Sequence, residues 1–207
     1  TFNPEITTSI LDGSAAKTSR RRFLESLIEN DPTGVFSNND NPYLGRTERH
    51  VRALAKHVRL IEICRSAGIG GTGDGECKGE ITLSPDFHTL VSSLSDILPT
   101  NLHWAMFLPN IMSLCDEEQQ AVWLPLCRDW KMIGCYAQTE LGHGSNVRAL
   151  ETTATFVPES EGGNKGGSWR IHSPTLTSTK FWPGTLGKVG NHAMVIARLI
   201  DGDNVDR

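Results

Sequence analysis

Residues 131–138 read Lys-Met-Ile-Gly-Cys-Tyr-Ala-Gln, and the pattern of the chain changes at this stretch. Upstream, apolar residues recur at helical spacing, whereas downstream, short runs rich in Thr, Val, Ile and aromatic residues are separated by glycines. Helices followed by strands give an α+β order, without the alternation that a parallel sheet requires. We therefore expect an all-helical domain over residues 1–131 and an incomplete, antiparallel, barrel-like β domain over residues 132–207.

Four or five helices are predicted in the first part. Ser84, Pro85 and Asp86 combine an N-cap, a proline at the first helical position and an acidic first turn. Asp116 with Gln119 three residues later is typical of a capping box. The apolar segment 102–108 is short and favours a buried helix. Helices are expected over residues 19–30 and 47–67, from residue 85, over residues 102–108 and from residue 116.

Five strands are predicted in the second part, from short runs of β-branched and aromatic residues. The glycine-rich stretch 160–167 predicts the tip of a hairpin. The strands are expected over residues 132–138, 152–157, 168–172, 175–182 and 192–200.

Composition excludes several classes of protein. The 207 residues carry 20 Lys and Arg against 24 Asp and Glu, a formal net charge of −4, which excludes a strongly basic nucleic-acid-binding protein. No run approaches the roughly 18 consecutive apolar residues that a membrane span needs, and the first residues lack the pattern of a secretory signal. Five cysteines with no Cys-x-x-Cys pair favour reduced core residues over a disulfide framework or a zinc site.

Two stretches match functional motifs only formally. Residues 68–73 read Gly-Ile-Gly-Gly-Thr-Gly, but a predicted helix precedes them where a dinucleotide-binding fold needs a strand. Glu140 and His143 have the Glu-x-x-His spacing of di-iron sites, but the motif occurs once and glycines flank the histidine, which favours a loop. We therefore predict a surface loop at the first stretch and no metal site at the second.

The strongest candidate for a binding site consists of residues 136–145 and 179–188. Each segment joins the end of a predicted strand to a glycine-rich turn. Backbone N–H groups and a hydroxyl in such turns can bind a polar ligand edge, while a large aromatic side chain offers a flat face. A planar cofactor with a polar edge suits this combination. Two ordinary turns over an aromatic core are the alternative.

Two motifs in this region resemble those of a known family. Residues 136–146, Tyr-Ala-Gln-Thr-Glu-Leu-Gly-His-Gly-Ser-Asn, and residues 173–184, Ser-Pro-Thr-Leu-Thr-Ser-Thr-Lys-Phe-Trp-Pro-Gly, closely resemble the flavin-binding motifs of peroxisomal acyl-CoA oxidases. The resemblance covers nearly the whole chain. It extends to residues 10–13, 102–109, 150–155, 186–188 and 191–193.

The resemblance implies an FAD-dependent enzyme that oxidises fatty acyl-CoA to trans-2-enoyl-CoA and passes the electrons to O2, giving hydrogen peroxide. It also implies a fold with a C-terminal helical bundle that this chain lacks. The family's catalytic base is a glutamate of that bundle, so no catalytic residue is expected here and the chain alone is expected to be inactive. The residues expected to bind FAD are Gln138, Thr139, Trp182 and Gly184, and those expected to face the acyl-CoA are Gly144 and Ser145.

Two alternatives to an oxidase stay open at this point. One is an acyl-CoA dehydrogenase, in which, by analogy, a threonine stands where this chain has Gly184, and a glycine there leaves room for oxygen beside the flavin. The other is a truncated product that binds a ligand or partner without catalysis. The resemblance further implies a homodimer and a peroxisomal location, although the terminal Val-Asp-Arg is not a Ser-Lys-Leu signal.

The chain departs from the family in three places. Residues 181–185 read Phe-Trp-Pro-Gly-Thr where the oxidases usually have Trp-Trp-Pro-Gly-Gly. The glycine-rich stretches 70–79 and 162–167 are interpreted as surface insertions that leave the cofactor site undisturbed.

Overall fold

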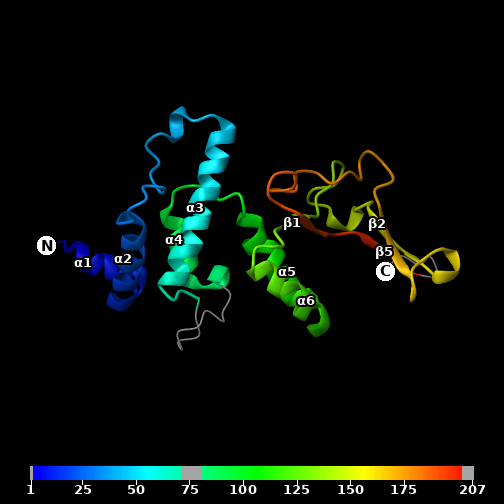
Figure 1. The fold of residues 1–207 in the computed structure, drawn as a ribbon, viewed down its shortest axis with the longest axis horizontal. Coiled ribbons are helices and arrows are strands. Elements are labelled where there is room, and N and C mark those ends of the chain that lie inside the picture. The colour runs from blue at the N-terminus through cyan, green and yellow to red at the C-terminus, as the bar shows by residue number, and fades with distance from the viewer. Residues whose placement is uncertain (1, 71–80, 202–207) are drawn as a thin grey trace. The chain divides into compact units, whose positions relative to one another are not determined.

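The structure is a computed structural model that describes residues 2–70 and 81–201. The chain divides into two compact units, Thr1–Asn101 and Leu102–Arg207, and each is described by itself (Figure 1). The domain limits at residues 131 and 132 stay a prediction. Most of the glycine-rich stretch 68–79, together with Cys77, lies outside the described residues.

The first unit is helical, as predicted. The helices expected over residues 19–30 and 47–67 are confirmed, and Ser84 caps the next helix by accepting a hydrogen bond from Phe87 N–H at 3.1 Å. A further helix, α1, was not predicted, although Asn3 as N-cap and Pro4 at the first position are helix-start signals. The elements are α1 (Pro4–Asp12), α2 (Ala15–Glu29), η1 (Asn41–Tyr43), α3 (Arg46–Ser66), η2 (Ile81–Leu83) and α4 (Pro85–Ser93).

The core of this unit also contains a buried charge. The Lys56 side chain on α3 is fully buried, and its Nζ lies 2.8 Å from Asp96 Oδ2 and contacts Asn38 Oδ1. These contacts pair the charge that burial would otherwise penalise, and they fasten the segments after α2 and α4 to α3. The surrounding apolar core includes Leu24, Leu60, Cys64, Phe87, Leu90, Leu94 and Leu98.

The second unit begins with helices and continues with strands. The buried segment predicted at 102–108 is a π-helical turn, η3 (His103–Phe107), in which Leu108 N–H donates to the His103 carbonyl. Pro109 has no N–H to continue the regular ladder, which accounts for the wider turn. The helices that follow are α5 (Leu108–Leu114) and α6 (Glu117–Arg128), and the capping box of Asp116 and Gln119 is confirmed.

Among the residues that the structure describes, five strands form two small sheets, so the α+β order is confirmed. β1 (Gly134–Ala137) pairs in parallel with β4 (His192–Val195). β2 (Thr153–Val157) pairs antiparallel with β3 (Ser168–His172), as the predicted hairpin requires, and parallel with β5 (Arg198–Ile200). The expectation of an antiparallel, barrel-like domain is corrected accordingly: the two-stranded sheet is parallel, the three-stranded sheet is mixed, and no closed barrel forms within the described residues.

Two strand predictions were wrong in detail. Residues 175–182 form turns with a single bridge between Lys180 and Glu140. The strand expected over residues 192–200 is two strands, because the chain changes partner: Ile196 N–H donates to Ala137, whereas Arg198 N–H donates to Thr152. The Ile196 carbonyl at this break accepts a hydrogen bond from Lys180 Nζ at 2.7 Å.

Within the part of the chain that the structure describes, no helix combines the length and apolar character needed to cross a membrane.

Candidate functional site

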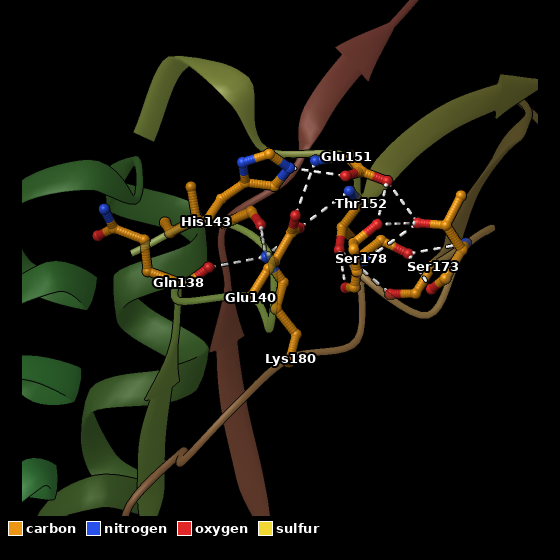
Figure 2. A network of polar contacts seen from close by, with 11 residues as sticks. Gln138, Glu140, His143, Glu151, Thr152, Ser173, Ser178 and Lys180 are labelled. Atoms are coloured by element: carbon orange, nitrogen blue, oxygen red, sulfur yellow. Dashed lines mark hydrogen bonds and ion pairs between the residues drawn. The ribbon is translucent and has the colours of Figure 1, made fainter. Parts of the chain in front are cut away.

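Lys180 joins the two segments that the sequence singled out. Its Nζ donates to the Gln138 carbonyl at 3.0 Å, to the Ile196 carbonyl at 2.7 Å and to Glu140 Oε1 at 3.1 Å (Figure 2). An ammonium group has three protons, so all of its donors have partners. We call the contacts of Lys180 and Glu140 the inner cluster.

Glu140 is buried and ionised. Its Oε2 accepts the Glu151 N–H at 2.8 Å, and its Oε1 accepts the Thr152 N–H at 2.9 Å. Burial alone would raise the pKa of this carboxyl, but the two backbone N–H groups, Thr152 and Lys180 together lower the pKa to about 2. The ion pair with Lys180 is therefore intact at neutral pH.

The inner cluster fixes the position of Thr139. Its carbonyl accepts Phe181 N–H at 2.9 Å, and the neighbouring Leu141 N–H donates to the Thr179 carbonyl at 3.0 Å. Gln138 Oε1 accepts the Tyr136 hydroxyl at 2.8 Å. Gln138 and Thr139 are both half-buried. The structure thus brings residues 136–141 and 179–181 side by side, as a shared binding site requires.

A second group of polar contacts lies around Glu151. His143 Nε2 is 2.6 Å from Glu151 Oε1 (Figure 2). Glu151 Oε2 accepts the Thr177 hydroxyl at 3.0 Å and also the Thr175 hydroxyl. We call His143, Glu151, Thr175 and Thr177 the outer cluster. The hydroxyl of Thr175, followed by His143, lowers the pKa of Glu151. Gly144 and Ser145, which follow His143, are exposed.

The Glu-x-x-His spacing is structural. Glu140 and His143 contact each other through their backbones, with Glu140 N–H donating to the His143 carbonyl at 3.1 Å, while their side chains bind different partners. No group of His, Cys, Asp and Glu suited to a metal ion occurs among the described residues.

Phe181 and Trp182 form an exposed aromatic pair. Their rings stack with centroids 5.7 Å apart and an angle of 24° between the planes. Trp182 is 76% exposed, and its φ of +41° lies in the left-handed region that side chains disfavour. Strained backbone of this kind is found preferentially at ligand-binding positions.

Gly184 stands where a side chain would meet a neighbour. A Cβ at this position would lie 2.6 Å from Leu102 Cδ1. The next residue, Thr185, has a φ of +74°, and its buried Oγ1 has no hydrogen-bond partner among the described residues. A glycine in place of Thr185, as in the Gly-Gly pair of the family motif, would avoid both the strained backbone and the unpartnered hydroxyl.

Some residues of the site were missed by the sequence analysis. Lys180 and Thr152 were not singled out, and Glu151 was noted only as part of a motif. Their importance depends on contacts between residues far apart in the sequence, and no local pattern contains such contacts. Glu140 and Glu151 are 11 positions apart, and Gln138 and Lys180 are 42 positions apart. For Lys180, the only signal in the sequence was its place in the aromatic motif, four residues before Gly184.

Comparisons with known proteins agree on one family. The family model "Acyl-coenzyme A oxidase N-terminal" matches residues 3–133. The mouse peroxisomal acyl-coenzyme A oxidase 1 is 40% identical over 97% of this chain, which covers 28% of that protein, and the human protein is 40% identical over 96%, covering 27%. The chain thus spans little more than a quarter of the length of these relatives.

Solved structures give the same result. Acyl-CoA oxidase 1 of Arabidopsis thaliana matches 100% of this chain and 28% of its own length, with a TM-score of 0.82 and 35% identity. Acyl-CoA oxidase-2 of Caenorhabditis elegans, solved with FAD, ascaroside-CoA and ATP, matches 100% of the chain and 28% of its own, with a TM-score of 0.74 and 31% identity. These matches agree with the helical first unit, the mixed strand pairing and the two motif segments that Lys180 joins. The chain belongs to the acyl-CoA oxidase family.

Proposed function

We propose that the protein carrying this chain is an FAD-dependent acyl-CoA oxidase. It oxidises fatty acyl-CoA to trans-2-enoyl-CoA and passes the electrons to O2, which becomes hydrogen peroxide. The observation that supports this most directly is the inner cluster, because Lys180 and Glu140 hold the two flavin-motif segments together. The names of the relatives and the FAD in the C. elegans structures support the same proposal.

The residues present fit the cofactor. A ligand with a polar edge and a flat ring can bind Gln138 and Thr139, whose backbone the inner cluster fixes, and can stack near the exposed Trp182. Gly184 adds no side chain beside them. FAD bound here would supply the acceptor for the hydride that leaves the β-carbon of the substrate. Thr139 and its backbone would stabilise the charge that develops on the pyrimidine side of the ring.

The acyl-CoA is placed on the side of Gly144 and Ser145. Both residues are exposed, and a Cβ at Gly144 would touch nothing within 4 Å. This leaves space for a ligand to approach the backbone closely.

Neither glutamate of the site is proposed as the base that removes the α-proton. Every carboxylate oxygen of Glu140 and Glu151 already accepts at least one hydrogen bond. Both serve to hold loops in place, and the base is a glutamate of the C-terminal region of the whole protein.

We also infer peroxisomal location and a homodimer. The location comes from relatives that are named peroxisomal, and the dimer comes from the resemblance to the family.

Two measurements test the proposed function. Whole protein given an acyl-CoA should consume O2 and release peroxide, whereas reduction of an electron-transfer protein without peroxide would identify a dehydrogenase. The purified 207-residue chain should lack oxidase activity. A yellow, active chain would contradict the proposal that the base lies elsewhere.

A further inference from the structure

We propose that the outer cluster is a positioning device for acyl-CoA: it closes the loop of residues 144–150 and thereby sets substrate affinity without a part in flavin binding. The inference rests on the proposed function, because it concerns the substrate side of the same site.

The closing contact joins the two ends of the loop. His143 immediately precedes residues 144–150 and Glu151 immediately follows them, and their side chains meet at 2.6 Å between Nε2 and Oε1. A loop whose ends are held together has fewer conformations to lose when it binds a ligand. Gly144 and Ser145 lie directly beside this contact.

The contact is itself anchored to another segment. Glu151 Oε2 accepts the hydroxyls of Thr175 and Thr177, while Oε1 contacts His143, so both carboxylate oxygens are held. Gly142 N–H donates to the Thr177 carbonyl at 2.9 Å, and a Cβ at Gly142 would lie 2.8 Å from Thr177 Cβ. The segment that leads into the loop is therefore tied to residues 175–177 by a backbone hydrogen bond as well as through Glu151.

Inside the loop, the contacts are local. Val147 N–H donates to the Ser145 carbonyl at 3.0 Å, and Ala149 N–H donates to the Asn146 carbonyl at 3.1 Å. These bonds shape the loop but do not place it on the unit. Its placement depends on His143 at one end and on Glu151 with the buried Leu150 at the other.

The Thr177 side chain can be changed without removing a contact of the inner cluster, because among the described residues its hydroxyl bonds only Glu151 and Thr175. The hydrogen bonds of Lys180 Nζ go to Gln138, Ile196 and Glu140, none of which belongs to the outer cluster. Glu151 contacts Glu140 through its backbone N–H, which a side-chain substitution retains. A substitution at Thr177 should therefore change the KM for acyl-CoA without changing flavin occupancy.

The test uses the whole protein and three substitutions. Thr177→Val removes one donor to Glu151, together with the contact between the Thr177 and Thr175 hydroxyls, at nearly constant volume, and Thr177→Ser keeps both. Thr155→Val makes the same change on β2, outside both clusters, and is the matched control. The measurements are KM and kcat for an acyl-CoA, flavin occupancy from visible absorbance, and hydrogen exchange of residues 144–150.

We expect Thr177→Val to raise KM about three- to tenfold, the effect of one ordinary hydrogen bond at an exposed position, with kcat and flavin occupancy changed less than about twofold. Thr177→Ser should restore the parent KM, and Thr155→Val should leave it unchanged. In Thr177→Val, exchange over residues 144–150 should be faster than in the control.

Two results would overturn the inference: flavin occupancy that falls together with the rise in KM, or a KM and an exchange rate that do not change. If the parent protein oxidises no acyl-CoA, the proposed function fails, and hydrogen exchange alone then decides whether the outer cluster closes the loop. Equal exchange in Thr177→Val and Thr155→Val rejects loop closure in that case.

Discussion

Lys180 Nζ lies 3.1 Å from Glu140 Oε1, and this pair connects segments that are 40 residues apart in the sequence. The Glu140 side chain is fully buried and that of Lys180 is 15% exposed. Buried pairs are strongly destabilising when one partner is removed, because the other charge stays buried without compensation.

Lys180→Met should therefore lower the free energy of unfolding by about 3 kcal/mol, within the range for a broken buried pair. It should also reduce FAD occupancy, since the Gln138 carbonyl loses the Lys180 ammonium that donates to it. Urea denaturation and visible absorbance measure the two effects. Adding Glu140→Gln should recover part of the stability by neutralising the remaining charge. Lys165→Met, at an exposed lysine of the hairpin tip, is the control, and a similar loss there would contradict the assignment.

His103 should make the protein sensitive to mild acid. Burial lowers the pKa of its imidazole from 6.5 to about 4, more than the hydrogen bond to the Cys127 backbone raises it. Nδ1 accepts the Gly134 N–H at 3.1 Å, which requires the unprotonated nitrogen. Because the unfolded state binds the proton more readily, stability should be fully present above pH 6.5 and fall by about 3 kcal/mol as the pH drops to 4.

The slope of stability against pH checks this prediction. His103→Leu should be less stable at neutral pH but should lose the slope between pH 6.5 and 4. A parent protein with constant stability over that range would show that the imidazole is not held neutral.

Thr185→Gly should stabilise the chain. Thr185 has a φ of +74°, and left-handed backbone costs a residue with a side chain about 1–2 kcal/mol. The substitution also removes the unpartnered Oγ1, while glycine costs about 0.5–1 kcal/mol in lost chain entropy. We expect a net gain of about 1 kcal/mol, seen as a higher urea midpoint. Thr185→Val keeps the strained backbone and should gain less. A lower midpoint for Thr185→Gly would indicate that the hydroxyl has a partner in the whole protein.

Gly184→Thr in the whole protein should slow reoxidation of the flavin by O2 more than its reduction by acyl-CoA. We expect a difference of about tenfold, or roughly 1.4 kcal/mol in the barrier, because the new side chain occupies space beside the cofactor. Stopped-flow absorbance separates the two half-reactions. The new Cβ also meets Leu102 Cδ1, so Gly184→Thr combined with Leu102→Ala controls for simple crowding. Equal effects on both half-reactions would count against the role of the glycine.

Local signals predicted much of the helical structure. Ser84 with Pro85 and Asp116 with Gln119 are caps that act within a few residues, so the sequence contains all that they need. The strand expected over residues 175–182 was wrong because Thr175 and Ser178 close a turn through side-chain to backbone hydrogen bonds in both directions. Contacts of Glu151 and Lys180 with distant parts of the chain then hold this segment. The division between β4 and β5 depends on a change of partner strand, from β1 to β2, which the local sequence does not show.

The sequence predicted the two segments of the candidate site, but not the residues that hold these segments together. Residues 136–145 and 179–188 were identified by motif, and the structure brings parts of both together. Which residues hold them there depends on pairing across the fold, so Lys180, Glu151 and Thr177 became evident only in three dimensions. The roles of Gln138, Thr139, Gly144, Ser145, Trp182 and Gly184 toward ligands stay predictions.

The most direct test of the central claim is the stoichiometry of O2 consumption and peroxide release by the whole protein during acyl-CoA oxidation. We predict one O2 consumed and one hydrogen peroxide formed for each trans-2-enoyl-CoA. Enoyl-CoA formed without peroxide, with the electrons going to an electron-transfer protein, would contradict the account.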